Sequence, residues 1–316
     1  DSTLIENVEK IKPSLYMRVT DIAKDILHIH HAENKTHQIH PNYVHALKPS
    51  PNYNIEQKES ELFIALDSKS ETPSPICFHA VEELKKKSLA FMSSRNGWVP
   101  HAKNSLHDAE DWFEIAIHGN DDGGPLSLHP DIIQSLSRDV ICWTKSTTNC
   151  PLAIRTMGIL PHSASVVYDL ILDSNRTKEI NQYSAGRKDL WLLQSSSECI
   201  MKVVKGGNLP PLRKKPVPFV TFFRGDQTCK DGRRYLVTTR TANLVDDQGN
   251  WDGTKFLSEI KMGSNIIMDI DGDVNRCLFI SSIEATSPLP MMVAKKVGLK
   301  GGISFINGLR SCLSSS

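Results

Sequence analysis

Histidines are the first residues in this sequence whose spacing could support chemistry, because six of them lie within residues 28–45. They are His28, His30, His31, His37, His40 and His45. A metal site needs ligands that converge on one point, whereas helical neighbours one or two positions apart do not face each other. Cysteine and carboxylate partners at metal-ligand spacing are also absent from this segment. We therefore predict a solvated or partly packed histidine cluster and no metal site.

The segment 269–275 carries oxygen-bearing side chains at alternate positions, as a calcium-binding loop does. Such a loop has glycine at its sixth position and glutamate at its twelfth. Here glycine is the fourth residue, and Ile280 occupies the twelfth position. Alternating apolar residues flank the pair Asp271-Gly272, a pattern typical of a β-hairpin. We predict a hairpin turn and not a calcium site.

Motifs for covalent catalysis or nucleotide binding are missing. The sequence has no G-x-S-x-G, no P-loop and no G-x-G-x-x-G after a strand. Ser, His and Asp are plentiful, but their spacing singles out no triad. We expect no catalytic residue, no cofactor and no enzymatic activity.

A loop between two expected strands, residues 206–216, combines apolar and basic side chains. Its three prolines exclude regular structure. Its leucines and consecutive cations are Leu209, Leu212, Arg213, Lys214 and Lys215. An ordinary solvated loop has this composition, and so does a loop that inserts leucines into a membrane interface while its cations meet anionic headgroups.

Length and composition exclude several classes of protein. The 316 residues, 39% hydrophobic and 23% charged, suffice for two folded domains. With 37 basic and 36 acidic residues, the net charge of +1 gives no global attraction to nucleic acid. No window approaches the roughly eighteen apolar residues of a membrane-spanning helix. The seven cysteines are scattered and never paired as C-x-x-C, which fits the reducing cytoplasm.

The first part of the chain differs in pattern from the rest. It starts at Asp1 without methionine or signal peptide, so we expect a processed or excised chain. Apolar spacing predicts an amphipathic helix over 15–31, and a Ser/Thr/Pro-rich linker is expected over 68–75. We predict a partly helical N-terminal extension over residues 1–75 and a second domain over 76–316.

Hydrophobic periodicity predicts the elements of that second domain. Helices are expected over 76–94, 164–172 and 288–313, the last with Ser287 as N-cap, and a turn or short helix over 175–183. Strands are expected over 112–117, 140–145, 152–160, 190–193, 200–204, 219–224, 235–241, 265–270 and 276–284, and residues 62–66 could be a strand or part of a helix. The later strands follow one another without crossover helices. The predicted class is therefore α+β with a meandering antiparallel sheet.

Several of these segments, in order, resemble the START (steroidogenic acute regulatory protein-related lipid-transfer) domain family over residues 80–313. The matching segments are Asn96-Gly97-Trp98, the strand and helix over 153–173, Gly207-Asn208-Leu209, the strand 219–224, and the C-terminal stretches 290–297 and 302–310. Three features depart from the family pattern. Val217-Pro218-Phe219 replaces a common Arg-Asp pair, a tryptophan expected within 175–183 is missing, and residues 119–138 look inserted.

The resemblance implies a helix-grip fold, in which a curved antiparallel sheet wraps around a long C-terminal helix and encloses a lipid cavity. It implies lipid binding and transfer between membranes by a cytoplasmic, peripherally membrane-associated monomer that binds no nucleic acid. The lipid would be a sterol, phospholipid or sphingolipid, and the C-terminal helix and the 206–216 loop would gate its entry. Two alternatives are an enzyme of the same fold that acts on a lipid-like or aromatic substrate, and a lipid-sensing regulatory module.

Candidate contact residues follow from this assignment. Arg224 lies in an apolar strand, so it would need a carboxylate or a lipid oxygen if buried, or else it marks the strand end in solvent. The candidate lipid contacts are Arg155, Arg224, Glu284, Phe222, Thr239, Met292, Ile303 and Ile306. The candidate membrane contacts are the five loop residues named above, with Leu289 and Met291. Gly298, Gly301 and Gly302 either let the last helix move as a gate or permit its close packing on the sheet.

Overall fold

The computed structural model describes residues 62–65, 78–94, 96–101, 126–146, 152–196, 198–209, 216–228, 234–245, 259–287 and 289–315. It divides into two compact units, residues 1–84 with 242–254, and residues 85–241 with 255–316. In the first unit, β1 (Leu62–Ala65) pairs in parallel with residues 242–245. The helix predicted over 15–31 and the strand predicted over 112–117 lie outside the described residues. The division predicted at residue 75 stays a prediction.

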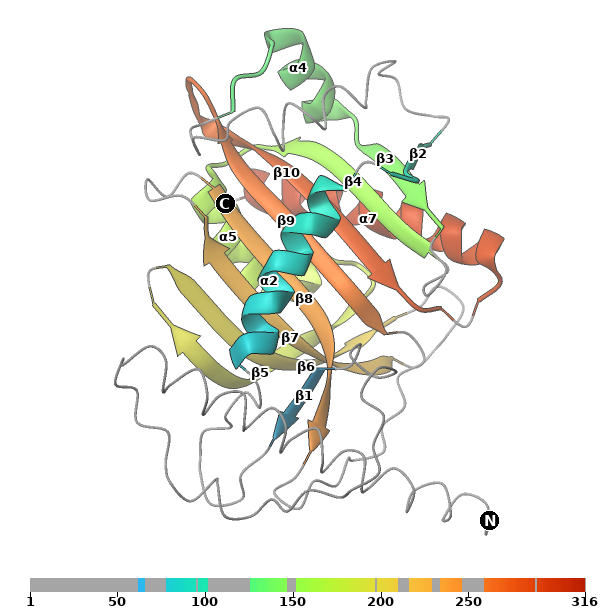
Figure 1. The fold of residues 1–316 in the computed structure, drawn as a ribbon. Coiled ribbons are helices and arrows are strands. Elements are labelled where there is room, and N and C mark those ends of the chain that lie inside the picture. The colour runs from blue at the N-terminus through green and yellow to red at the C-terminus, as the bar shows by residue number, and fades with distance from the viewer. Residues whose placement is uncertain are drawn as a thin grey trace. The chain divides into compact units, whose positions relative to one another are not determined.

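The second unit is built on an antiparallel sheet with the strand order β2-β3-β4-β10-β9-β8-β7-β6-β5 (Figure 1). Its strands are β2 (Val99–Pro100), β3 (Ile141–Lys145), β4 (Leu152–Leu160), β5 (Ser184–Ser195), β6 (Cys199–Asn208), β7 (Val217–Gln227), β8 (Arg234–Val245), β9 (Ile260–Ile270) and β10 (Asp273–Ala285). The strands from β5 to β10 pair in chain order, as the predicted meander requires. The last strand, β10, then pairs with β4.

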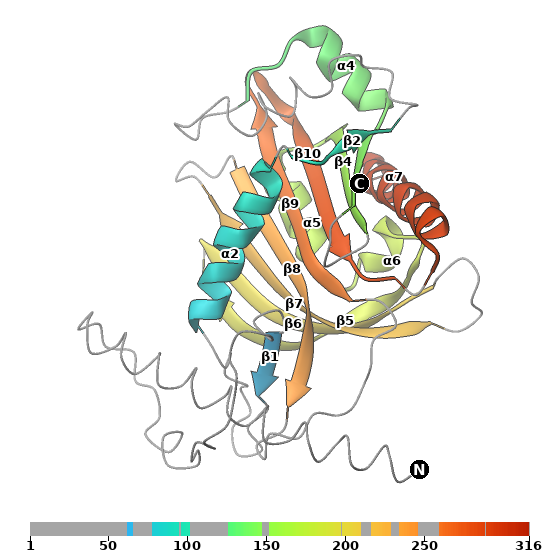
Figure 2. The ribbon, with the colours of Figure 1, turned by 45° about the vertical axis from the view of Figure 1, so that its right-hand side comes forward.

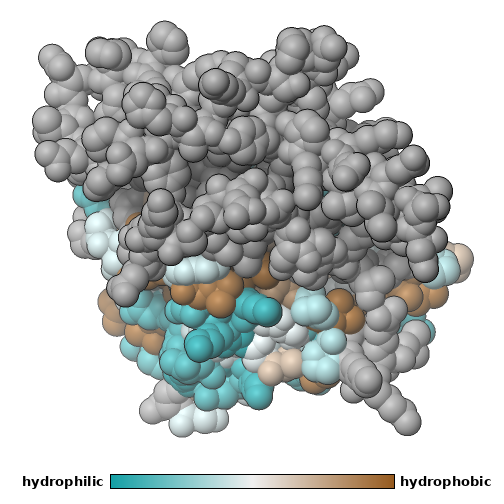
Figure 3. All heavy atoms as spheres, turned by 90° about the horizontal axis from the view of Figure 1, so that it is seen from below, coloured by the Kyte–Doolittle hydropathy of each residue, from teal (hydrophilic) through white to brown (hydrophobic). Residues whose placement is uncertain are grey.

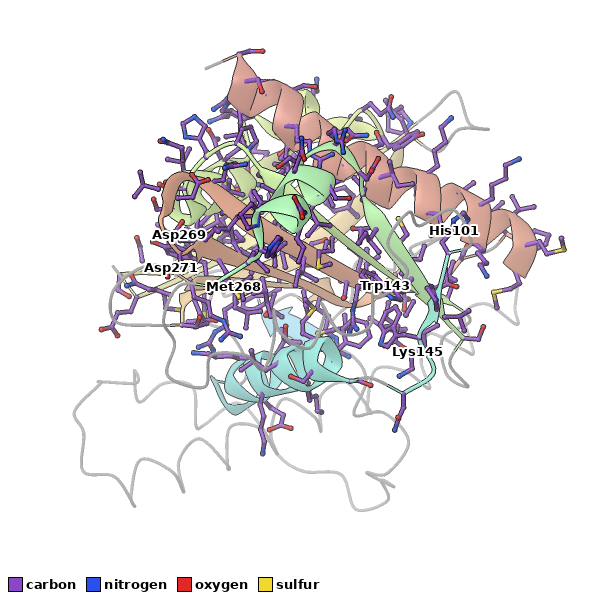
Figure 4. The ribbon with its side chains drawn as sticks, turned by 90° about the horizontal axis from the view of Figure 1, so that it is seen from above. His101, Trp143, Lys145, Met268, Asp269 and Asp271 are labelled. Atoms are coloured by element: carbon purple, nitrogen blue, oxygen red, sulfur yellow. The ribbon has the colours of Figure 1, made fainter. Side chains whose placement is uncertain are left out.

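Helices lie on both faces of this curved sheet (Figures 1 and 2). On the outer face lies α2 (Phe78–Ser93), which belongs to this unit from Lys85 onward. On the inner face lie α5 (Ala164–Leu172), α6 (Thr177–Ile180) and α7 (Met291–Ser314). The view from above places the sheet between α2 and α7 (Figure 4). A further helix, α4 (Pro130–Arg138), precedes β3.

Cross-strand register assigns each side chain to one face. Arg155, Ser282, Ser264, Thr238 and Arg224 are successive partners on β4, β10, β9, β8 and β7, so all five lie on one face. Arg155 donates hydrogen bonds to carbonyl groups of α2, which makes this the outer face. The residue next to each of these along its strand therefore lies on the inner face.

An apolar cluster fills each face. The outer cluster joins Met92 of α2 and Leu136 of α4 to strand residues such as Met157 and Ile280. The inner cluster joins α5 and α7 to Phe279 and neighbouring strand residues. None of the helices in the described part of the chain is long and apolar enough to span a membrane.

The predicted fold class is confirmed, because a curved antiparallel sheet holds the long C-terminal helix against its inner face. The hairpin at Asp271-Gly272 is also confirmed, with Gly272 at a φ of 72° between β9 and β10. The start of the last helix differs from the prediction. Ser287 accepts a hydrogen bond from the backbone N–H of Leu289, and Pro290 occupies the N-cap position of α7.

Candidate functional site

Arg155, a predicted lipid contact, lies on the outer face beneath the C-terminal end of α2. Its guanidinium donates to the carbonyl oxygens of Phe91 and Met92 at 2.9 and 3.0 Å, and to Ser282 Oγ at 2.9 Å. The C-terminal carbonyls of a helix lack intrahelical partners and carry partial negative charge. Burial lowers the pKa of Arg155 to about 9, which leaves the side chain charged at neutral pH. Arg155 therefore caps α2.

Arg224, another predicted lipid contact, is also buried on the outer face. Its Nε lies 2.8 Å from Oδ2 of Asp226, and its second amino nitrogen donates to Oδ1 at 2.9 Å. Lys85 Nζ lies 3.2 Å from the same carboxylate. A buried cation needs a carboxylate or another strong acceptor, and the protein itself supplies one here.

The predicted lipid contacts with charged side chains therefore share the face that carries α2. Arg155 and Arg224 face α2, and Glu284, which pairs with Ala153, shares their face. Phe222 lies two residues from Arg224 on β7 and points the same way. Because these strands are apolar on both sides, hydrophobic periodicity in the sequence does not indicate which residues lie on the inner face.

The other predicted lipid contacts are spread over the inner face and α7. Thr239 lies on the inner face and is 8% exposed. Ile306 is buried against Gly158 of β4. Ile303 is 36% exposed and Met292 is 86% exposed. The structure thus brings Thr239 and Ile306 to the inner face, and leaves Met292 on the surface.

Polar residues occur in adjacent pairs on four neighbouring strands. Their outer members are in register, whereas on the inner face Thr239 lies one row away from the other three. The pairs are Arg155-Thr156, Ser281-Ser282, Ser264-Asn265 and Thr238-Thr239. One member of each pair lies on the outer face and the other on the inner face. This alignment was not recognised from the sequence, although consecutive polar residues within apolar strands are the signal that marks it.

The outer members of these pairs are hydrogen-bonded. Ser88 of α2 lies 2.6 Å from Ser264 Oγ, and Thr238 donates to Ser88 at 3.0 Å. Ser282 accepts from Arg155. This polar row fixes α2 on the sheet.

The inner members have no such partners. Among the described residues, no hydrogen bond is made by the side chains of Thr156, Thr239, Asn265 and Ser281. The hydroxyl of Thr221, on the inner face of β7, is fully buried and also lacks a partner. Buried polar groups are normally paired, and Thr221 is an exception among the described residues. The other four side chains make no hydrogen bond within the protein, so they are available to a bound molecule.

The centre of the inner face is also incompletely covered. Ile283 is 37% exposed although β10 lies between β4 and β9, and Asn265 and Ser281 are half-buried. The inner helices leave this region open because α7 packs on β4 and β3, whereas α5 packs farther along β9 and β10. We call Ile154, Thr156, Thr239, Asn265, Ser281 and Ile283 the inner-face patch.

The glycines of α7 differ in their surroundings. A Cβ on Gly302 would lie 2.6 Å from Thr156 Cγ2, and one on Gly298 would overlap Ile154 Cδ1. These two glycines permit close packing on β4. A Cβ on Gly301, turned about 100° around the helix from Gly302, would meet nothing within 4 Å.

Two cations on the inner face, Arg187 and Lys202, lie at its β5–β6 end. Arg187 donates to the carbonyl oxygen of Ile171, and Lys202 donates to that of Leu172, both at the C-terminus of α5. Lys202 also pairs with Asp189 at 3.0 Å. Burial lowers the pKa of Arg187 to about 10 and also lowers that of Lys202. Both cations are engaged by the end of α5.

The start of α7 exposes apolar side chains next to lysines. Met291, Met292 and Val293 are 41%, 86% and 39% exposed. The exposed lysines that follow are Lys295, Lys296 and Lys300. Leu289, a predicted membrane contact, is half-buried against the cluster of Leu152 and Ile154. Figure 3 shows the molecule from below, where hydrophobic and hydrophilic residues of the described part of the chain lie side by side on the surface.

Of the predicted membrane-contact residues in the 206–216 loop, only Leu209 lies among the described residues. Leu209 is half-buried, and its N–H donates to the carbonyl oxygen of Tyr183 at 2.6 Å. Leu212, Arg213, Lys214 and Lys215 lie outside the described residues. Within the described residues, no group of histidine, cysteine, aspartate or glutamate side chains could hold a metal ion.

The chain is similar to known proteins in structure and not in sequence. No protein-family model matches the sequence, and no curated protein matches it. Human StAR-related lipid transfer protein 5 is 12% identical, with a TM-score of 0.49 over 74% of this chain and 94% of that one. Human STARD10 is 10% identical, with a TM-score of 0.45 over 73% and 79%. The Zhui aromatase/cyclase from Streptomyces is 9% identical, with a TM-score of 0.35 over 50% and 91%.

The fold assignment depends on this chain's own topology. Its meander from β5 to β10, the pairing of β10 with β4, and the placement of α7 on the inner face are features of a helix grip. These elements include the segments that carry the sequence resemblance. In fold, the chain is START-like.

Proposed function

We propose that this protein binds one lipid-like molecule against the inner-face patch, beside α7, and carries it between membranes. The observation that supports the proposal is the exposed apolar surface of Ile283 beside polar side chains that make no hydrogen bond within the protein, in the middle of a sheet face flanked by helices. A bound molecule would cover Ile283 and give the polar groups partners.

The apolar residues around the patch suit a hydrocarbon. Ile154, Ile283 and Phe223 occupy one cross-strand row, and Phe305 of α7 packs edge-on against Phe279 of β10. Burial of apolar surface contributes about 25 cal/mol per Å². A hydrocarbon leaving a bilayer for this site therefore stays out of water while in transit.

The start of α7 is suited to contact with a membrane. Its exposed apolar residues can enter the interface, and the residues from Met291 to Ser314 include no aspartate or glutamate. Each lysine near an anionic surface contributes about 1 kcal/mol, and this contribution falls as salt is added. We include Leu289 and the predicted loop, Leu209 and residues 212–215, in the same contact surface.

Native mass spectrometry of the purified protein tests the binding, because a co-purified lipid adds its mass to the chain at a ratio of one to one. A vesicle assay then tests transport. Stoichiometric movement of lipid between donor and acceptor vesicles indicates a carrier, whereas binding without movement indicates a lipid sensor. Chemical conversion of the bound molecule indicates an enzyme, and the absence of any binding contradicts the proposal.

A single substitution on α7 tests the location of the site. Gly301→Leu places a side chain in unoccupied space and improves helix propensity by up to about 1 kcal/mol. We expect it to lower lipid binding without lowering the melting temperature. Ser311→Leu, at an exposed position of the same helix, is the matched control and should bind lipid normally. Equal binding by both variants would place the site elsewhere.

Membrane contact has its own test. Changing Arg213, Lys214 and Lys215 to Ser, or Met291 and Met292 to Ser, should weaken flotation with anionic liposomes and leave thermal stability unchanged. If flotation is unaffected in both variants, this surface is not the membrane contact.

A further inference from the structure

The unpaired groups of the inner face are all uncharged. Thr156, Thr239 and Ser281 offer hydroxyls, and Asn265 offers an amide with both donors and an acceptor. Thr221 of β7 has a further hydroxyl on this face without a partner, although this hydroxyl is fully buried. A hydroxyl both donates and accepts, so one ligand hydroxyl could pair with two of these groups.

The two cross-strand rows that contain the patch hold no charged residue. From β4 to β7 one row reads Thr156, Ser281, Asn265, Val237 and Gly225, and the next reads Ile154, Ile283, Gly263, Thr239 and Phe223. Three cations on this face are bound to backbone carbonyl groups. Arg187 and Lys202 lie at its β5–β6 end and are bound to α5. Arg310 of α7 lies against Gly158 and donates to the carbonyl oxygens of Ile159 and Asp139. An ionised group placed on the patch would lose water without gaining a counter-charge.

We infer that the ligand's polar end is an uncharged hydroxyl, as in a sterol or a diacylglycerol, and that Asn265, Ser281 and Thr239 form its recognition site. The inference rests on the proposed lipid binding and narrows it. A phosphate-bearing headgroup would find no counter-charge among the residues of the patch. The polar residues on the outer face take no part, since they are bonded to α2 and to one another.

Matched pairs of lipids test the inference, and in each pair one member carries a free hydroxyl whereas the other carries a phosphate or sulfate ester at the same position. The purified full chain is titrated with dioleoylglycerol and with dioleoyl phosphatidic acid, which have the same acyl chains, and then with cholesterol and cholesterol sulfate. We expect the hydroxyl lipid of at least one pair to bind at least tenfold more tightly than its charged counterpart. Equal or tighter binding of the charged lipid in both pairs would overturn the inference but leave lipid binding intact. If none of the four binds and the protein carries no lipid, both proposals fail.

Adjacent serines on β10 provide a matched pair of variants. Ser281→Ala removes an inner hydroxyl and should weaken binding of the preferred hydroxyl lipid about fivefold to tenfold, the loss of one hydrogen bond. Ser282→Ala removes an outer hydroxyl bonded to Arg155. It should lower the melting temperature and leave the affinity ratio between hydroxyl and charged lipids unchanged.

A separate substitution tests the side-chain amide of Asn265. Asn265→Leu keeps the size of the side chain and should reduce the preference for the hydroxyl lipid over its hydroxyl-free analogue, cholesterol against cholestene. An unchanged preference in both Ser281→Ala and Asn265→Leu would show that these residues do not recognise the ligand.

Discussion

The guanidinium carbon of Arg155 lies 4.0 Å from the centroid of the Trp98 ring. This stacking joins the middle of β4 to the segment that follows α2. The same guanidinium donates to the carbonyl oxygens of Phe91 and Met92, so one side chain fixes both the end of α2 and the turn after it. Gly97, at a φ of 80°, provides the turn that brings Trp98 back over Arg155.

Arg155→Met should therefore destabilise the fold. The substitution retains an unbranched side chain but removes the charge-assisted hydrogen bonds, which contribute about 1.5–3 kcal/mol, and the cation–π contact. We expect a loss of about 2–3 kcal/mol in urea unfolding and a shift in Trp98 fluorescence. Arg138→Met, at an exposed position of α4, is the control. Equal stability of the two variants would contradict the capping role.

Substitution of Asp226 should destabilise the fold more than substitution of either cation with which it pairs. Asp226→Ala removes the carboxylate from two buried or partly buried cations, Arg224 and Lys85, and should cost about 3–5 kcal/mol. The double variant Arg224→Leu with Asp226→Leu should recover part of this loss, since it leaves fewer unpaired charges. Because the pair lies on the outer face, neither variant should change which lipid is bound. A change in lipid preference would mean that Arg224 reaches the ligand.

Alkaline pH should weaken the fold through its buried thiols. Burial raises the pKa of Cys142 to about 12, and that of Cys199 to about 11, from the ordinary 9. The unfolded thiols ionise near pH 9 while the folded ones stay protonated, so stability is full below pH 9 and falls between pH 9 and 12. Urea midpoints measured at pH 8 and 10.5 test this, with Cys142→Ala as the variant that should show a smaller fall. An identical fall in that variant would assign the effect to other groups.

Arg310 should hold the C-terminal half of α7. It donates to the carbonyl oxygens of Ile159 at 3.0 Å and Asp139 at 3.1 Å. Arg310→Met should cost about 2 kcal/mol and speed amide hydrogen exchange in the last turns of the helix. The exposed Lys300→Met should do neither. Unchanged exchange in Arg310→Met would show that packing alone holds the helix.

The sequence predicts the bounds of the helices and strands better than it predicts the face of the sheet on which each side chain lies. The bounds of β4 and α5 agree with the prediction because each is an uninterrupted apolar segment between clear turn residues. The strand predicted over 190–193 extends to Ser184–Ser195, since Arg187, Lys188 and Asp189 hide a strand at the sheet edge. The helix α4 was not predicted, because it lies in a stretch interpreted as an insertion.

The site was harder to predict than the fold. Arg224 and Thr239 were both candidate contacts, yet they lie on opposite faces of neighbouring strands. Only the register between strands separates such residues, and a single sequence does not give the register. The consecutive pairs Ser264-Asn265 and Ser281-Ser282 indicate that both faces are polar at this level, but not that the two members differ in their partners.

The attachment of α7 is uneven, and this affects how fast a ligand could exchange. Gly302 lies against Thr156, and Arg310 binds carbonyl groups beyond it, whereas the first turn exposes Met291 and Met292. If entry requires only the first turn to unwind, its activation barrier is that of a local fluctuation. Exchange would then be rapid in a protein whose global unfolding is slow, and a variant that stabilises the whole domain could leave the exchange rate unaltered.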